Sequence, residues 1–160
     1  MIAYTDGACA QNAKSAGPGG YGVVVLDDNE NLITTYSHKE NNTTNNRQEM
    51  KAIIWALVHY GKRAPLTIYS DSAYAVNTFT SWMYNWAANN WVKSDNKIPE
   101  NLDLVQAYYN LIQQGYKCEL LKVKGHAGNK GNIYADALAT GKIKTKEVKF
   151  LWDKSTELQI

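Results

Sequence analysis

Branched and aromatic residues gather in three short segments near the start of the chain, and each segment predicts a β-strand. The segments are residues 2–5, 21–26 and 32–38, in which branched side chains suit a pleated strand. The polar run at 27–31 separates the last two segments and predicts a turn. Because turns this short join neighbouring antiparallel strands, this part of the chain predicts an antiparallel meander.

From residue 43 onward the apolar residues recur at helical spacing instead. Met50, Ile53 and Leu57 lie on one face of a helix expected over 47–60, which ends at Gly61. The later pattern predicts a strand over 66–70, helices over 72–80 and 81–92, a helix opening at Pro99 and Asn101, a strand over 118–123 and a helix over 133–140. This order predicts a mixed α/β fold whose later strands run parallel to the first.

Residues 17–22 match the G-x-G-x-x-G pattern of dinucleotide-binding sites. Such a site needs a strand before the glycines and a helix after them, whereas here a valine-rich strand follows. The glycines therefore predict a flexible turn that leads into the second strand.

The composition bounds the class of protein. The 160 residues fit one domain, expected to be a monomer, and the net charge of +2 does not by itself indicate a nucleic-acid partner. Positive charge is concentrated late, because residues 117–149 carry eight lysines against three acids. Two cysteines form no disulfide framework, and no signal peptide or membrane span is visible, so we expect a cytoplasmic location.

Four carboxylates stand at positions where the predicted elements begin or end. Asp6 and Asp71 follow predicted strands, and the carboxyl ends of parallel strands meet at one edge of an α/β sheet. Clustered carboxylates repel one another unless a cation neutralises them, and their hard oxygen atoms select Mg²⁺ or Mn²⁺. The four are Asp6, Glu49, Asp71 and Asp136, and together they predict a two-metal site for phosphodiester cleavage.

Each carboxylate also has a simpler explanation when it is taken alone. Glu49 lies three residues after Asn46, which fits a capping box. Asp71 fits a helix N-cap and Asp136 fits a solvated helix residue. Asp6 is hardest to explain in this way, because a charge at the end of a buried strand is costly without a partner.

A series of short motifs occurs in one order along the chain. They are YTDGAC at 4–9, GPGGYG at 17–22, TNNRQE at 44–49, YSDS at 69–72, VKGHAG at 123–128 and AD at 135–136. The ordered set resembles type 1 ribonuclease H over residues 1–141, with 142–160 as a C-terminal extension that forms a surface tail or partial helix. The resemblance implies a five-stranded mixed β-sheet with three antiparallel N-terminal strands and helices on both faces.

The resemblance also implies an activity and its residues. The activity is Mg²⁺-dependent endonucleolytic hydrolysis of the RNA strand of RNA–DNA hybrids, with two ions per site, Mn²⁺ as a substitute, and 5′-phosphate and 3′-hydroxyl products. His126 falls on the family's loop histidine, which moves a proton or helps product leave. The other positions carried over are the metal-binding carboxylates Asp6, Glu49, Asp71 and Asp136, the minor-groove contacts Asn12, Asn45 and Asn46, the phosphate-pocket residues Thr44 and Asn101, and the DNA-channel residue Trp82.

The asparagines suit their implied role because the 2′-hydroxyl, which distinguishes RNA from DNA, lies in a shallow minor groove and both donates and accepts hydrogen bonds. Taken singly they also fit loop or N-cap residues, and a lone histidine such as His126 fits a surface residue. Asn101 fits a helix N-cap, a role compatible with anion binding. Trp86 and Trp91 are expected to pack against the core.

The chain departs from bacterial members of this family in two segments. Residues 13–16 lengthen the stretch that follows Asn12. Residues 83–98 form a basic protrusion in many bacterial members, but here they carry only Lys93 and Lys97, offset by Asp95. Because each phosphate contact steepens the salt dependence by about 0.9, we expect weaker hybrid binding and a shallower salt dependence than in a member with a basic protrusion.

Two other functions remain open from the sequence. A non-catalytic hybrid-binding module would need the asparagines but not all four carboxylates. A nuclease of the same fold that acts on DNA duplexes or junctions would share the acids but not the Asn45–Asn46 pair and the Lys-Gly-His loop.

Overall fold

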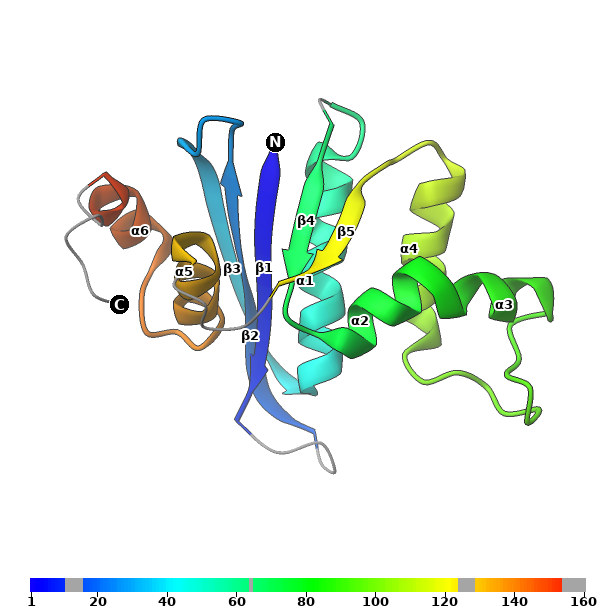
Figure 1. The fold of residues 1–160 in the computed structure, drawn as a ribbon. Helices are drawn as coiled ribbons and strands as arrows, with labels where there is room; N and C mark the ends of the chain where they lie inside the picture. Colours follow the sequence, from blue (N-terminus) through cyan, green and yellow to red (C-terminus); the bar gives the residue numbers. More distant parts are fainter. Residues whose placement is uncertain (11–15, 64, 124–128, 154–160) are drawn as a thin grey trace.

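A computed structural model describes residues 1–10, 16–63, 65–123 and 129–153. Five strands form one sheet in the order β3-β2-β1-β4-β5, and helices cover it (Figure 1). The strands are β1 Ile2–Cys9, β2 Gly17–Leu26, β3 Leu32–Thr43, β4 Thr67–Ser70 and β5 Glu119–Lys122. The helices are α1 Asn45–Tyr60, α2 Ala73–Asn77, the π-helix η1 Thr78–Trp82, α3 Met83–Ala88, α4 Leu102–Gln113, α5 Lys130–Ala139 and α6 Thr145–Trp152.

The sheet is mixed, as the sequence predicts. Strand β2 pairs antiparallel with both β1 and β3, which forms the expected N-terminal meander. Strand β4 runs parallel to β1 on its other side, and β5 runs parallel to β4. The helical crossovers after β3 and β4 supply the length that a parallel connection needs.

Two apolar cores lie on opposite faces of the sheet, and strand β2 contributes to both. Val23 and Val25 face the core beneath α1 and α4, whereas Val24 and Leu26 face the core beneath α5 and α6. Successive side chains of a strand point to opposite faces, so a strand covered on both sides reads as a continuous apolar run. This explains the valine-rich stretch and confirms the expectation of helices on both faces.

The glycine-rich segment corrects one expectation, because it is part of a strand and not a flexible turn. Strand β2 begins at Gly17 and pairs with both of its neighbours. A Cβ on Gly20 would lie 2.9 Å from the backbone oxygen of Ala139, and one on Gly22 would lie 2.5 Å from that of Ala135. Glycine in a strand often marks a close approach of another backbone, and here the approaching backbone is that of α5.

The helical half differs from the prediction in its boundaries. The predicted helices over 72–80 and 81–92 are one continuous run from α2 through η1 to α3, and it ends at Ala88. Helix α5 begins three residues earlier than expected, after Asn129 caps it by accepting from the backbone N–H of Asn132 at 3.1 Å. Part of the C-terminal extension forms α6.

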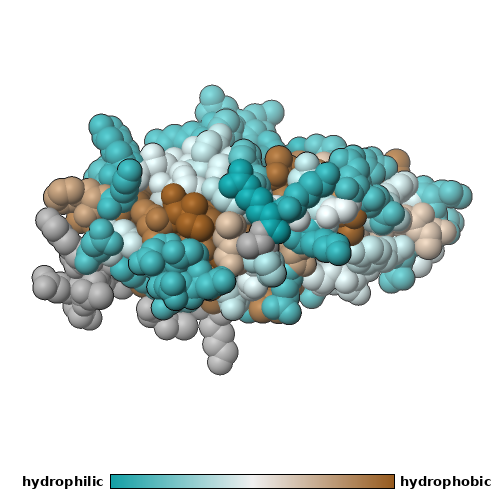
Figure 2. Space-filling view, turned by 90° about the horizontal axis from the view of Figure 1, so that it is seen from above, coloured by the Kyte–Doolittle hydropathy of each residue, from teal (hydrophilic) through white to brown (hydrophobic). Residues whose placement is uncertain are grey.

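The surface seen from above in Figure 2 is mostly hydrophilic, and its apolar area forms patches between polar side chains. No helix in the described part of the chain has both the length and the apolar character that a membrane crossing requires.

Candidate active site

Three carboxylates from three elements meet at one end of the sheet. Thr5 of β1 is the last residue that pairs with β4, through Ser70, so Asp6 and Asp71 lie side by side where this parallel pairing ends. Asp6 does not follow its strand as expected, because β1 continues to Cys9 by pairing with β2. Glu49 reaches the same place from the N-terminal half of α1. Ligand oxygens of these three side chains lie within 4.8 Å of one another, which is close enough for one cation to contact all three.

The backbone of Gly7 ties two of the carboxylates together. Its N–H lies 2.9 Å from Oδ1 of Asp6 and 2.6 Å from Oε1 of Glu49, and both oxygens accept from it. A Cβ at residue 7 would lie 2.3 Å from the backbone nitrogen of Glu49. Glycine is therefore required here for α1 to approach β1 closely enough to deliver Glu49.

The capping explanations for Glu49 and Asp71 are wrong. Helix α1 is capped by Thr44, whose side chain accepts from the backbone N–H of Arg47 at 3.2 Å. Helix α2 is capped by Ser72, which accepts from Ala75 at 3.1 Å. Because other side chains cap both helices, Glu49 and Asp71 remain available to the cluster.

Burial and mutual repulsion dominate the electrostatics of the cluster. Burial raises the pKa of Asp6 above its usual range, and the charges of Asp71 and Asp136 raise this pKa further. Burial likewise raises the pKa of Glu49, with further contributions from Asp6 and Asp71. An anionic cluster this enclosed favours a bound cation, and a donor set made only of carboxylate oxygens fits Mg²⁺ or Mn²⁺.

Asp136 approaches the cluster from the opposite face of the sheet. It lies on α5, which packs against β1 and β2, and Gly22 beneath that helix pairs with Asp6. The side chain of Asp136 raises the pKa of Asp6 by direct interaction. Asp136 is not one of the three groups whose oxygens lie within 4.8 Å of one another, so it stands at the border of the cluster.

Tyr4 and Gly131 hold the start of α5, and the sequence pattern did not indicate either. The Nδ2 of Asn129 donates to the hydroxyl of Tyr4 at 2.9 Å. A Cβ on Gly131 would lie 2.1 Å from the ring of Tyr4. An asparagine directly before a helix is a recognisable N-cap signal, but its second bond to β1 depends on tertiary packing.

Two further residues connect the candidate substrate-binding residues that the structure describes. The guanidinium of Arg47, near Thr44 at the start of α1, donates to Oδ1 of Asn101 at 3.4 Å and pairs with Asp103. Tyr74 accepts from Nδ2 of Asn101 at 3.0 Å, and its ring lies 6.3 Å from that of Trp82.

Of the remaining candidates, the structure describes Asn101, Asn45 and Asn46. Asn101 occupies the N-cap position of α4 with a left-handed backbone, φ 58°, but its side chain makes no capping bond. Asn45 and Asn46 are the first two residues of α1. Trp86 and Trp91 pack against the core, as expected. Asn12 and His126 lie outside the described residues.

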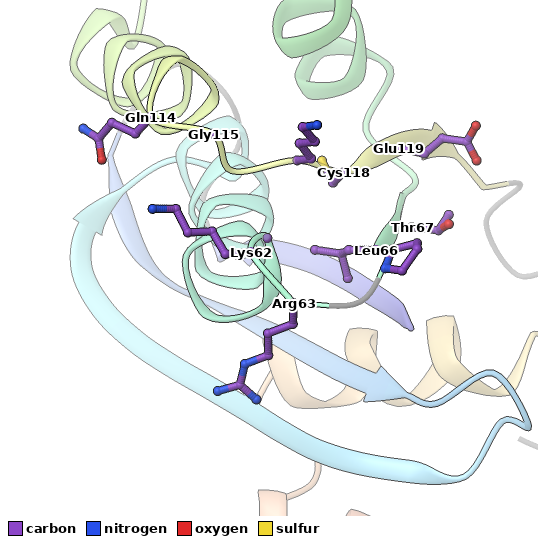
Figure 3. A pocket seen from close by; sticks show the side chains of 11 residues that line it. Lys62, Arg63, Leu66, Thr67, Gln114, Gly115, Cys118 and Glu119 are labelled. Carbon is purple, nitrogen blue, oxygen red and sulfur yellow. The ribbon is translucent and has the colours of Figure 1, made fainter.

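A cavity lies at the other end of the sheet. It measures about 770 Å³ and is lined by residues at the starts of β4 and β5, such as Leu66, Thr67 and Glu119 (Figure 3). Asp71 follows the other end of β4. The carboxylate cluster does not line this cavity; within the cluster Asp6 is buried and Glu49 and Asp71 are half-buried.

Residues 1–144 match the family described as RNase H. The chain belongs to the ribonuclease H family. A ribonuclease H of Thermoanaerobacter sp. (strain X514) is 42% identical over 142 residues, covering 88% of each chain. The crystal structure of LC9-RNase H1, a type 1 RNase H with the type 2 active-site motif, is 32% identical with a TM-score of 0.72, covering 88% of this chain and 70% of that one.

LC11-RNase H1, solved in complex with an RNA/DNA hybrid, shares the fold at 21% identity and a TM-score of 0.63, and covers 92% of this chain and 98% of that one. Membership of this family makes the chain a metal-dependent nuclease, of the type 1 ribonuclease H class. The match to the family ends at residue 144, directly before α6.

Proposed function

We propose that the protein hydrolyses the RNA strand of RNA–DNA hybrids with two Mg²⁺ ions, for which Mn²⁺ can substitute, and leaves 5′-phosphate and 3′-hydroxyl ends. The observation that carries the proposal is the enclosed cluster of Asp6, Glu49 and Asp71 in a ribonuclease H fold. When bound, two such ions supply an activated water and stabilise the leaving oxygen.

The carboxylates of this chain have separate tasks in that proposal. Asp6, Glu49 and Asp71 would hold the ions between them, and Asp136 would complete the set from α5. Gly7 orients Asp6 and Glu49 by donating to both. Because these groups are held by the sheet and two helices, they need little rearrangement when substrate arrives.

Recognition of the hybrid is proposed to use the start of α1 and the helices opposite it. Asn45 and Asn46, with Asn12, would contact the minor groove, where the 2′-hydroxyl marks the RNA strand. Thr44 and Asn101 would hold a phosphate of the DNA strand. The side chain of Trp82 is 41% exposed, which leaves its ring available to pack along that strand.

His126 is proposed to move a proton or to assist product release, because imidazole titrates near neutral pH. Replacement of His126 by alanine is then expected to slow turnover but to leave measurable cleavage. Loss as complete as that of a carboxylate variant would show that a shuttle role is too weak a description.

The decisive experiment compares a matched RNA–DNA hybrid, RNA duplex and DNA duplex, each with and without Mg²⁺. Cleavage confined to the RNA strand of the hybrid, and only with Mg²⁺, supports the proposal. Binding without cleavage would instead indicate a hybrid-binding module, and cleavage of the DNA duplex would indicate a DNA nuclease of the same fold. Labelled ends identify the 5′-phosphate and 3′-hydroxyl.

A monomer in the cytoplasm is also part of the proposal. Cys9 and Cys118 are free thiols, which is typical of a reducing compartment. Light scattering of the purified chain tests the oligomeric state.

A further inference from the structure

Two hollows adjoin beside the carboxylate cluster, and Lys39 of β3 lines both. The first, of about 340 Å³, lies between the end of β1, the start of β2 and the end of α5. The second, of about 370 Å³, lies between β3, the end of α5 and the start of α6. Lys144 and Lys146 line the second hollow. The two hollows, with Lys39 between them, extend from β1 to α6, and we call this stretch of surface the path.

The strand register shows how near this path lies to the cluster. Lys39 pairs with Gly20, and Gly20 pairs with Ala8, two residues after Asp6. Because one strand lies between them, the Cα atoms of Lys39 and Ala8 are two strand spacings apart, which is about 10 Å. The path leaves the cluster on the side of α5 and α6, whereas α3 lies on the other side of β1 (Figure 1).

The path carries positive charge that the described residues do not neutralise. Lys39, Lys144 and Lys146 line the hollows, and Lys142 lies between Gly141 and Ile143, which line the second one. All four lysines are exposed, and none of them forms an ion pair within the described ranges. The nearest acid in sequence, Glu147, accepts from the backbone N–H of Lys144 at 3.0 Å. We call these four lysines the lysine surface.

Packing holds the lysine surface in place. Nζ of Lys39 lies 3.2 Å from the position that a Cβ on Gly141 would take, so this amine lies against the end of α5. Helix α6 is anchored by Trp152, whose Nε1 donates to the backbone oxygen of Glu30 at 3.3 Å. Nζ of Lys130 donates to the backbone oxygen of Trp152 at 2.7 Å, which links α6 to α5.

We propose that the lysine surface binds the phosphate backbone of the hybrid beyond the cleavage position. The inference rests on the proposed function and deepens it, because it adds a contact site that begins about 10 Å, or roughly three nucleotide steps, from the end of β1. The opposite flank, residues 83–98, has only Lys93 and Lys97 against Asp95. Of these two flanks, the lysine surface therefore attracts a polyanionic substrate more strongly.

The test measures hybrid binding by fluorescence anisotropy in EDTA, which prevents cleavage, at several KCl concentrations. The test variant replaces Lys39, Lys144 and Lys146 with glutamine in the full chain. The matched control replaces Lys62, Arg63 and Lys117 with glutamine, because these exposed cations line the cavity at the other end of the sheet and the loss of charge is equal. Thermal unfolding of both variants checks that they remain folded.

The proposal predicts that the test variant binds a long hybrid about tenfold more weakly at low salt, with a salt slope shallower by about 2 to 3. The control is expected to keep the slope of the parent. Equal changes in both variants, or an unchanged slope in the test variant, would overturn the proposal.

Trimmed hybrids locate the contact. Two substrates are used. One keeps only about three base pairs on the 5′ side of the cleavage position, and the other keeps only about three base pairs on the 3′ side. The difference between parent and test variant should vanish for one of them, and persistence with both would overturn the proposal. Binding is measured without Mg²⁺, so its result does not depend on cleavage. Absence of cleavage by the parent with Mg²⁺ would refute the proposed function but not the binding result.

Discussion

The carboxylate cluster and the lysine surface are neighbours with opposite physical character. The cluster is made of carboxyl groups and is partly buried: Asp6 is 4% exposed, and Glu49 and Asp71 are half-buried. The lysine surface is cationic and exposed, and it stands on the rim formed by β3, α5 and α6. Buried charges interact strongly, and removal of one partner changes the energy of the others greatly. Exposed charges act additively and are screened by salt. The comparison predicts that single substitutions have large effects in the cluster and small effects on the lysine surface.

The largest effect is expected for Asp71→Asn. The change removes an anionic oxygen with almost no change in shape, so the fold should persist while cleavage of the hybrid falls by about 10³-fold or more. Steady-state cleavage and thermal unfolding measure the two quantities. Near-full Mg²⁺-dependent activity would remove Asp71 from the catalytic set and would contradict the expectation that single substitutions in the cluster have large effects.

A smaller but clear effect is expected for Gly131→Ala, which changes no charge. The new Cβ would enter the ring of Tyr4, so α5 must shift and carry Asp136 with it. We expect a loss of about 1–3 kcal/mol in stability and a lower kcat. Chemical denaturation and kinetics test this prediction. As a control, Gly115→Ala meets no atom within 4 Å but has φ +96°, so it should lose stability through backbone strain and leave kcat unchanged.

Burial, together with repulsion from Asp6 and Asp71, predicts that Glu49→Gln stabilises the metal-free protein. The raised pKa of Glu49 means that the folded state binds a proton that the unfolded state releases above its ordinary pKa near 4. Stability of the metal-free parent should therefore fall as the pH rises from about 5 to 8. Unfolding in EDTA should show Glu49→Gln to be more stable by about 1–3 kcal/mol at pH 8, with a flatter pH dependence. A less stable variant would contradict the account of the cluster.

Addition of Mg²⁺ tests whether the bound cation contacts Glu49. A cation that binds the folded state raises its stability by mass action, so Mg²⁺ should raise the melting temperature of the parent. The rise should be smaller for Glu49→Gln, which lacks one charged ligand. An equal rise in both proteins would place the bound ion away from Glu49.

The smallest effect is expected for single changes on the lysine surface. Lys146→Gln should weaken hybrid binding about twofold and reduce the salt slope by about 1. Salt titrations of binding measure both values. A tenfold loss from this one change would show that exposed charges here do not act additively.

The fold was predictable in its type and order but not in its close approaches. The apolar pattern predicts all five strands and the antiparallel meander, because alternation and branched residues reflect burial directly. The prediction of a turn for the glycines at 17–22 is wrong, because Gly20 and Gly22 leave room for the backbone of α5. A sequence pattern does not reveal which distant segment packs on a strand.

The sequence predicts the residues of the candidate site, of which the structure brings Asp6, Glu49 and Asp71 together, but it does not predict the contacts that support them. Asp6 and Asp71 follow from the rule that parallel strands end together, and Glu49 and Asp136 from the motif order. Arg47 and Tyr74, which connect Asn101 to α1 and to Trp82, were missed because their bonds cross between helices. The capping alternatives for Glu49 and Asp71 were settled only by the bonds of Thr44 and Ser72.

The sequence by itself determined the family and the strand order along the chain, and it predicts the four acids, because local patterning and motif order record burial and chemistry. The tertiary structure decided which acids meet, how closely α1 and α5 approach β1, and that Lys39 of β3 joins the lysines that begin α6. Those features depend on distances between segments far apart in the chain. Such distances are set by packing across the sheet, and no local pattern encodes them.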